Sequence, residues 1–98
     1  MKIQVQNVNF NGSTKLSETV EKKLLKLDTL YDKIKCANIY FKIENNNEKN
    51  NKTTEIVLEV PGDDLVVKKT GQTFEEGIDL AVDSLKRLLI KKKEKTSH

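Results

Sequence analysis

The sequence predicts an α+β fold of two layers, in which a four-stranded mixed sheet carries two side-by-side helices on one face. Four short segments alternate polar and apolar residues with the period of two that is typical of strands with one wet face. Two longer segments each carry one apolar stripe at helical spacing. The segments follow one another as β-α-β-β-β-α. We therefore expect the first two strands to pair in parallel through a right-handed crossover, and the other neighbours to be antiparallel.

Length and composition indicate a single domain. A chain of 98 residues, 36% hydrophobic and 34% charged, has room for one modest core. We expect one domain over residues 1–95 and a disordered tail over 96–98. No apolar run approaches the ~20 residues of a transmembrane helix, and the first ten residues are too polar for a signal peptide. The expectation is a cytoplasmic protein without a membrane partner.

The first strand and the first helix are predicted over residues 2–31. Ile3 and Val5 alternate with glutamines over residues 2–8, and Asn11-Gly12 interrupts this pattern. Ser13 is a favourable N-cap for a helix that runs to about Tyr31. The apolar stripe of this helix predicts its core residues, which are Leu16, Val20, Leu24, Leu27 and Tyr31.

Three further strands are predicted over 37–44, 53–60 and 65–70, each with one apolar face. Residues 45–52 contain no apolar side chain and several turn formers, so we expect a flexible loop there. The run Pro61-Gly62-Asp63-Asp64 predicts a turn.

The last helix is predicted over 73–95, with Thr73 as its N-cap. Its buried stripe is expected to contain Phe74, Ile78, Ala81, Val82, Leu85, Leu88 and Leu89. The opposite face begins acidic, with Glu75, Glu76, Asp79 and Asp83. It ends basic, with Lys86, Arg87, Lys91, Lys92, Lys93 and Lys95.

The charge is concentrated at the end of the chain. The net charge is +3, but residues 84–98 alone carry +5 and residues 1–83 carry −2. Cations at a helix C-terminus complement the helix dipole, each by roughly 0.3–1 kcal/mol. One or two lysines would serve that purpose, whereas residues 86–95 contain six basic side chains. The excess favours a surface that binds a polyanion such as RNA.

The first helix separates its charges into stripes. The stripe on one flank of the apolar face is basic and contains Lys15, Lys22, Lys26 and Lys33. Lys23 lies nearer the core, where its stem can cover apolar surface. The other flank is acidic and contains Glu21, Asp28 and Asp32. A solvated face with a Glu18–Lys22 pair is the alternative interpretation, but the segregation of signs favours RNA. If the helices are neighbours, this stripe meets the basic half of the last helix.

Catalytic groups are scarce. Cys36 is the only cysteine, so neither an internal disulfide nor a cysteine-based zinc site is possible. Its only candidate histidine partner is His98 in the tail. Asp79 and Asp83 lie one helical turn apart without a third ligand, which is typical of a solvated acidic turn. No glycine-rich phosphate loop occurs. We therefore expect that the protein is not an enzyme and that it binds no cofactor, no metal and no small-molecule substrate.

Two segments carry a resemblance to a known family. They are LSETVEKKLLKLDTLYDKI over residues 16–34 and GQTFEEGIDLAVDSLKRLLIKKKEK over 71–95. The chain resembles the short ribosome hibernation factors, also called ribosome-associated inhibitors or, under an older label, sigma-54 modulation proteins. In the last helix the match lies at Ile78-Asp79, Leu85, Arg87, Lys91 and Lys93. The chain departs from the family pattern at Thr73, Glu75 and Gly77, where Asp, Tyr and Ala are usual, and at Lys92, where an aromatic residue or His is common.

The resemblance implies the same β-α-β-β-β-α fold and a ribosomal partner. Family members bind the small subunit, alone (30S) or in the 70S ribosome, in the channel for mRNA and tRNA. They contact 16S rRNA through the basic helices and silence ribosomes in starved or stationary cells. The longer relatives have an extra C-terminal domain with which they dimerise ribosomes unaided, and this chain resembles the short form. Whether the short form needs a second factor for ribosome dimerisation stays open. The candidate RNA-binding residues are Lys22, Lys23, Lys26, Lys33, Lys86, Arg87, Lys91, Lys92 and Lys93.

Two alternatives stay open from the sequence. One is a protein-binding regulatory module of the sigma-factor modulation type, in which the acidic stripe of the first helix or an exposed sheet edge binds a protein. The other is a general double-stranded RNA binder, because α-β-β-β-α also describes that kind of domain.

Overall fold

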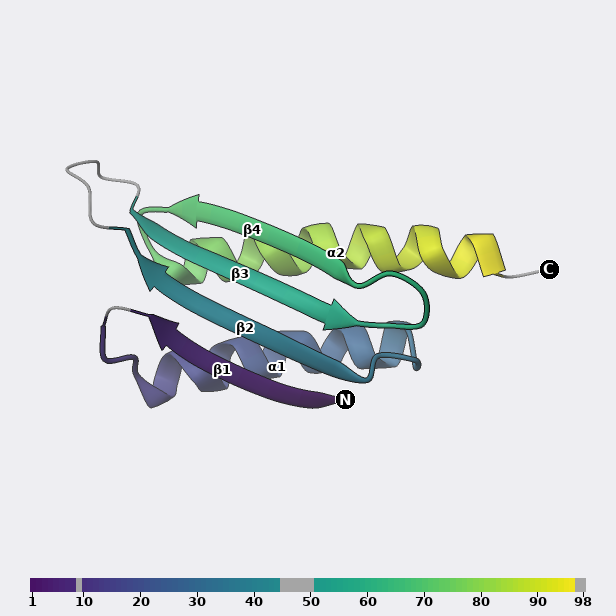
Figure 1. Cartoon of the computed structure of the whole chain (residues 1–98), viewed down its shortest axis with the longest axis horizontal. Coiled ribbons are helices and arrows are strands. Elements are labelled where there is room, and N and C mark those ends of the chain that lie inside the picture. Colours follow the sequence, from purple (N-terminus) through teal and green to yellow (C-terminus); the bar gives the residue numbers. More distant parts are fainter. Residues whose placement is uncertain (9, 45–50, 97–98) are drawn as a thin grey trace.

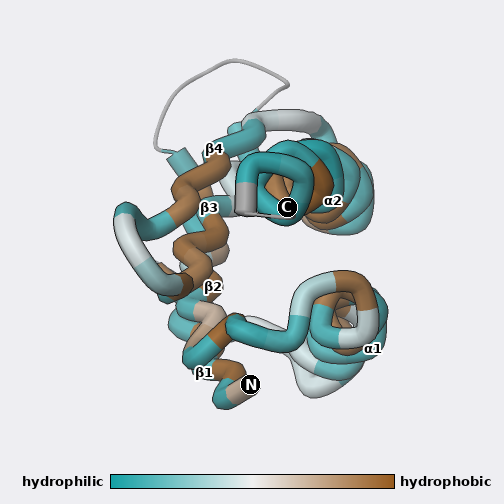
Figure 2. The backbone as a smooth tube through the Cα atoms, turned by 90° about the vertical axis from the view of Figure 1, so that its right-hand side faces the viewer, coloured by the Kyte–Doolittle hydropathy of each residue, from teal (hydrophilic) through white to brown (hydrophobic). Residues whose placement is uncertain are grey.

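Both helices of the chain pack against the same face of one sheet (Figure 1, Figure 2). The computed structural model describes residues 1–8, 10–44 and 51–96. Its elements are β1 (Lys2–Val8), α1 (Thr14–Leu30), β2 (Cys36–Ile43), β3 (Lys52–Glu59), β4 (Leu65–Gly71) and α2 (Phe74–Thr96). The predicted two-layer α+β architecture is therefore confirmed.

The sheet has the order β1-β2-β3-β4. β1 pairs in parallel with β2, with Val5 opposite Ile39, and the other two pairs are antiparallel. This is the predicted topology, in which α1 forms the crossover between two parallel strands. The alternation along β2 and β3 directs Ile39, Phe41 and Ile56 toward the helices, where each is fully buried.

The core lies between the sheet and the apolar stripes of the helices. α1 buries Leu16, Val20, Leu24 and Leu27, and Tyr31 just after it is also buried, as predicted. α2 buries five of its seven predicted stripe residues, Phe74, Ile78, Ala81, Leu85 and Leu89. Val82 packs only partly against the core. The prediction was wrong for Leu88, which is 38% exposed because it lies at the edge of the stripe.

Three phenylalanines join the start of α2 to the sheet. The Phe74 ring stacks on Phe10 with 5.1 Å between ring centroids. It also meets Phe41 of β2 edge-on at 5.3 Å. Both geometries are favourable for aromatic pairs, so this chain of rings holds the N-terminal end of α2 against the sheet.

Both helices begin where the sequence predicts. The Ser13 hydroxyl accepts a hydrogen bond from the Leu16 amide at 3.1 Å, and the Thr73 hydroxyl accepts one from the Glu76 amide at the same distance. Each cap satisfies a backbone donor that has no partner within its helix. Thr73, which departs from the family pattern, is thus the predicted N-cap of α2.

The remaining element boundaries agree with the predictions or differ from them by one residue. Of the predicted loop, residues 45–50 lie outside the described residues, and Lys52 already belongs to β3. α2 continues to Thr96, so the remainder of the predicted tail, 97–98, lies outside the described residues. The predicted turn between β3 and β4 contains Gly62 at φ +86°, a left-handed conformation that favours glycine.

Gly77 occupies a position in α2 where a larger side chain has no space. A Cβ atom at this residue would lie 2.6 Å from the Oγ1 of Thr54 and 3.2 Å from its Cβ. Thr54 is fully buried in β3, and its Oγ1 has no hydrogen-bond partner among the described residues. The glycine, which replaces the alanine of the family pattern, therefore allows α2 to lie close to a threonine of the sheet.

We expect Gly77→Ala to lower the free energy of unfolding by about 1 kcal/mol. Overpacking a buried site costs roughly 1–3 kcal/mol, which exceeds the ~1 kcal/mol that alanine gains over glycine in a helix. Urea denaturation followed by circular dichroism measures the change. In a Thr54→Ala background the 2.6 Å contact is gone, so there the same substitution should raise the free energy of unfolding. An equal loss in both backgrounds would contradict this explanation.

Candidate nucleic-acid interface

A groove runs between the two helices on the side away from the sheet. Figure 1 shows that α1 and α2 run parallel, so that the C-terminal end of α1 lies beside the last turns of α2. The groove has a volume of about 550 Å³. We call it the interhelical groove, and its lining consists of Lys23, Lys26, Leu27, Thr29 and Leu30 of α1 and Asp79, Val82 and Lys86 of α2.

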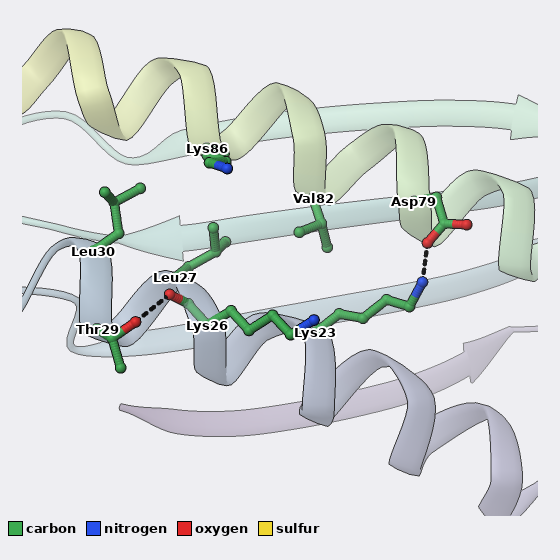
Figure 3. Close-up of a pocket in the computed structure, with 8 residues that line it drawn as sticks. All are labelled: Lys23, Lys26, Leu27, Thr29, Leu30, Asp79, Val82 and Lys86. Carbon is green, nitrogen blue, oxygen red and sulfur yellow. Dashed lines mark hydrogen bonds and ion pairs between the residues drawn. The ribbon is translucent and has the colours of Figure 1, made fainter.

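The base of the interhelical groove is apolar. Leu27 is almost completely buried, whereas Leu30 and Val82 are half-buried and border the groove. Figure 3 shows these side chains in the space between the two helices. The groove therefore combines an apolar floor with a charged rim.

One ion pair crosses this groove. The Lys23 ammonium group donates a hydrogen bond to the Asp79 Oδ1, and Figure 3 shows the lysine reaching from α1 to α2. Lys23 has the intermediate exposure that its place near the core boundary predicts, with 36% of its side chain exposed. The Asp79 side chain is 60% exposed, so solvent weakens the pair and its contribution to stability is small.

The structure brings three of the predicted RNA-binding residues together. Lys23, Lys26 and Lys86 all line the interhelical groove. The ε-amino groups of Lys26 and Lys86 have no described ion pair, and both residues are exposed. Lys22 and Lys33 are exposed as predicted but do not line this groove.

Arg87 lies apart from these three lysines. It follows Lys86 in sequence, and one residue corresponds to a rotation of about 100° around the helix. Its guanidinium group donates to the Asp83 carboxylate at 2.6 Å, one turn earlier on α2. Asp79 and Asp83 are both more than half exposed, which agrees with the predicted solvated acidic turn, and each carboxylate also has its own cationic partner.

The other basic residues of α2 are divided between the two sides of the helix. Lys91 and Lys92 border a second hollow, formed with Asp63, Leu65 and Leu88. The Lys93 ammonium group instead donates to the backbone carbonyl of Leu30, the last residue of α1, at 3.4 Å. A cation at this position satisfies a carbonyl at the end of α1, whose own last turn has no basic residue.

Sequence reasoning missed the role of Asp79. The signal that identifies its position is the spacing of seven residues between Asp79 and Lys86, which is two helical turns and places both on one side of α2. Thr29 was also missed. Its hydroxyl donates to the Lys26 carbonyl at 2.7 Å, at the rim of the groove.

Cys36 is half-buried at the start of β2. Burial raises the pKa of its thiol, and the neighbouring Glu59 raises that pKa further through a hydrogen bond and its negative charge, against a smaller opposing effect of Lys2. A thiol with a raised pKa is a poor nucleophile at neutral pH. Within residues 1–8, 10–44 and 51–96, no three His, Cys, Asp or Glu side chains are grouped as metal ligands.

Neither of the helices described here is long and apolar enough to cross a membrane.

Comparison with known proteins supports the resemblance found in the sequence. The model of the family described as sigma 54 modulation protein / S30EA ribosomal protein matches residues 3–97. The chain is 27% identical to a ribosome hibernation promoting factor of Pseudomonas putida, covering 97% of this chain and 89% of that protein. It is 28% identical to a protein of the same name from Azotobacter vinelandii, with coverage of 97% and 85%.

Solved structures show the same fold. A ribosomal subunit interface protein from Coxiella burnetii superposes with a TM-score of 0.84 at 26% identity, covering 96% of this chain and 99% of that one. The N-terminal domain of Protein Y from Thermus thermophilus gives a TM-score of 0.76 at 26% identity, with coverage of 91% and 96%.

Proposed function

The chain belongs to the sigma 54 modulation protein / S30EA ribosomal protein family, and we propose that it is a ribosome hibernation factor that binds RNA of the small ribosomal subunit through its two helices. The observation that carries this proposal is the convergence of Lys23, Lys26 and Lys86 on the interhelical groove. Two relatives named ribosome hibernation promoting factor support the ribosome as the partner.

The mechanism we infer is occupancy. Lysines on rigid helices supply phosphate contacts without reading the sequence, which suits folded RNA. A protein seated in the channel of mRNA and tRNA excludes both sterically, and this requires neither a cofactor nor a chemical step. In this proposal Lys22 and Lys33 extend the contact along α1. Arg87, Lys91, Lys92 and Lys93 extend it along the end of α2.

Sedimentation with purified ribosomes tests the proposal. The protein should move with 30S and 70S particles through a sucrose gradient. Particles that already carry mRNA and tRNA should not bind it. The three groove lysines alone predict a roughly 40-fold fall in affinity between about 50 and 200 mM salt, because binding releases counterions, and the further basic residues should make the fall steeper. The isolated large subunit is the control.

Three results would count against this function. They are an absence of sedimentation with 30S particles, binding that is independent of salt, and equal affinity for ribosomes and an arbitrary RNA duplex. The last would favour the general double-stranded RNA binder. In the acidic stripe of the alternative protein-binding module, Asp28 contacts the Met1 amino group at 3.5 Å, whereas Glu21 and Asp32 are exposed.

A further inference from the structure

We propose that the interhelical groove holds one unpaired nucleotide of the bound RNA. Its base lies on the apolar floor, its phosphate binds Lys23, and an amino group of the base donates to Asp79. This inference rests on the proposed function, because it names the part of the RNA that the two helices recognise.

The shape of the groove is the first argument. Its volume of about 550 Å³ lies within the roughly 300–1,000 Å³ that is typical of sites for small molecules. A regular RNA duplex presents phosphates on its outside and keeps its bases stacked within. Such a duplex can meet the lysines on the rim, but its bases cannot reach the floor formed by Leu27, Leu30 and Val82. A base that leaves the stack can cover this floor and remove its apolar surface from water.

The acidic side chain between the lysines is the second argument. A groove that bound phosphates alone would bind them more tightly without the negative charge of Asp79. A carboxylate accepts hydrogen bonds from N–H groups, and the amino groups of bases are such donors. Guanine offers a ring N–H and an amino group on the same edge, which matches the two oxygens of a carboxylate. Uracil has no amino group.

The Lys23–Asp79 ion pair can exchange its partners when the nucleotide enters. The phosphate takes the place of Asp79 beside Lys23, and the base takes the place of Lys23 beside Asp79. Lys23 then keeps an anionic partner, and Asp79 keeps a hydrogen-bond donor, so neither side chain is left without a partner. Lys26 and Lys86, on opposite walls of the groove, are then available to the phosphates on either side of the nucleotide.

Three RNA hairpins test this inference. They share one stem and differ in carrying no bulge, one unpaired guanosine or one unpaired uridine. Fluorescence anisotropy of labelled hairpins gives the affinities at a fixed salt concentration. We expect the guanosine bulge to bind about tenfold more tightly than the fully paired stem, and the uridine bulge to lose most of that gain.

Asp79→Asn separates recognition from structural support. It should abolish the preference for guanosine over uridine, while affinity for the paired stem is kept or rises because a negative charge is gone. Asp83→Asn is the matched control, because it makes the same change of charge on the same helix at the residue that pairs with Arg87. The control should keep the guanosine preference. If Asp79 only joined the two helices, Asp79→Asn would lower the melting temperature and leave the preference unchanged, which would overturn the inference.

The inference and the proposed function fail in different ways. A protein that sediments with 30S particles but binds all three hairpins equally has the proposed function without the nucleotide site. A protein that does not sediment with ribosomes lacks the proposed function. A guanosine preference that persists in Asp79→Asn would also overturn the inference.

Discussion

The double substitution Lys26→Glu with Lys86→Glu is expected to reduce affinity for 30S particles by more than about 100-fold at roughly 100 mM salt. The two lysines face the interhelical groove from opposite helices. Replacing them with carboxylates next to Asp79 changes a basic groove into an acidic one, which repels phosphates. Both residues are exposed, so the fold should survive, and a thermal melt checks this. Sedimentation with 30S particles over a range of protein concentrations measures the loss.

Two further variants define how specific this effect is. Lys2→Glu with Lys68→Glu makes the same change in net charge on the strands, away from the groove, and should weaken binding by less than about tenfold. Arg87→Glu with Lys91→Glu should have an intermediate effect, because Arg87 already has Asp83 as a partner and does not line the groove. Equal losses in all three double variants would mean that net charge governs binding, and not the groove.

Phe41→Ala is expected to lower the free energy of unfolding by about 3–5 kcal/mol. Phe41 is fully buried in β2, and its ring meets Phe74 edge-on. Its removal leaves a cavity under the first turn of α2 and ends the chain of rings that includes Phe10. Since small domains are stable by only about 5–15 kcal/mol, the variant should be close to unfolding at 37 °C. Chemical denaturation with urea measures the change.

Tyr40→Ala is the control for this prediction. Tyr40 is the preceding residue of the same strand, and its side chain lies on the opposite, uncovered face of the sheet. It loses only cross-strand contacts, each worth roughly 0.2–1 kcal/mol. A similar loss of stability in both variants would show that the contacts among Phe10, Phe41 and Phe74 do not hold α2 against the sheet.

The fold could be predicted because its determinants are local. Ser13 and Thr73 cap helices through hydrogen bonds to residues three positions later, and the alternation along β2 and β3 is visible in a few residues. Leu88 was the misassigned core residue because a helical pattern does not show where the stripe ends. The need for Gly77 was also hidden, since it depends on Thr54 in a different strand.

The candidate site could be predicted only in outline. Composition and spacing identify basic residues on both helices, but the rotation of each helix decides which of them converge. Lys86 enters the groove and Arg87, the next residue, does not. Lys23 and Asp79 are 56 residues apart in sequence, and only the packing of the two helices makes them partners.

The separation of charge along α2 affects how this molecule meets a polyanion. The first turn of α2 contains Glu75 and Glu76, and its last turn contains Lys93 and Lys95. At 1.5 Å per residue, Glu76 and Lys93 lie about 25 Å apart along the axis. Electrostatic interactions are screened within about 8 Å at physiological ionic strength, so the two ends of α2 act on their surroundings separately. The electric field of the RNA should therefore orient the approaching protein so that the C-terminal end of α2 points toward the RNA. A protein with a small net charge thereby gains a preferred direction of approach.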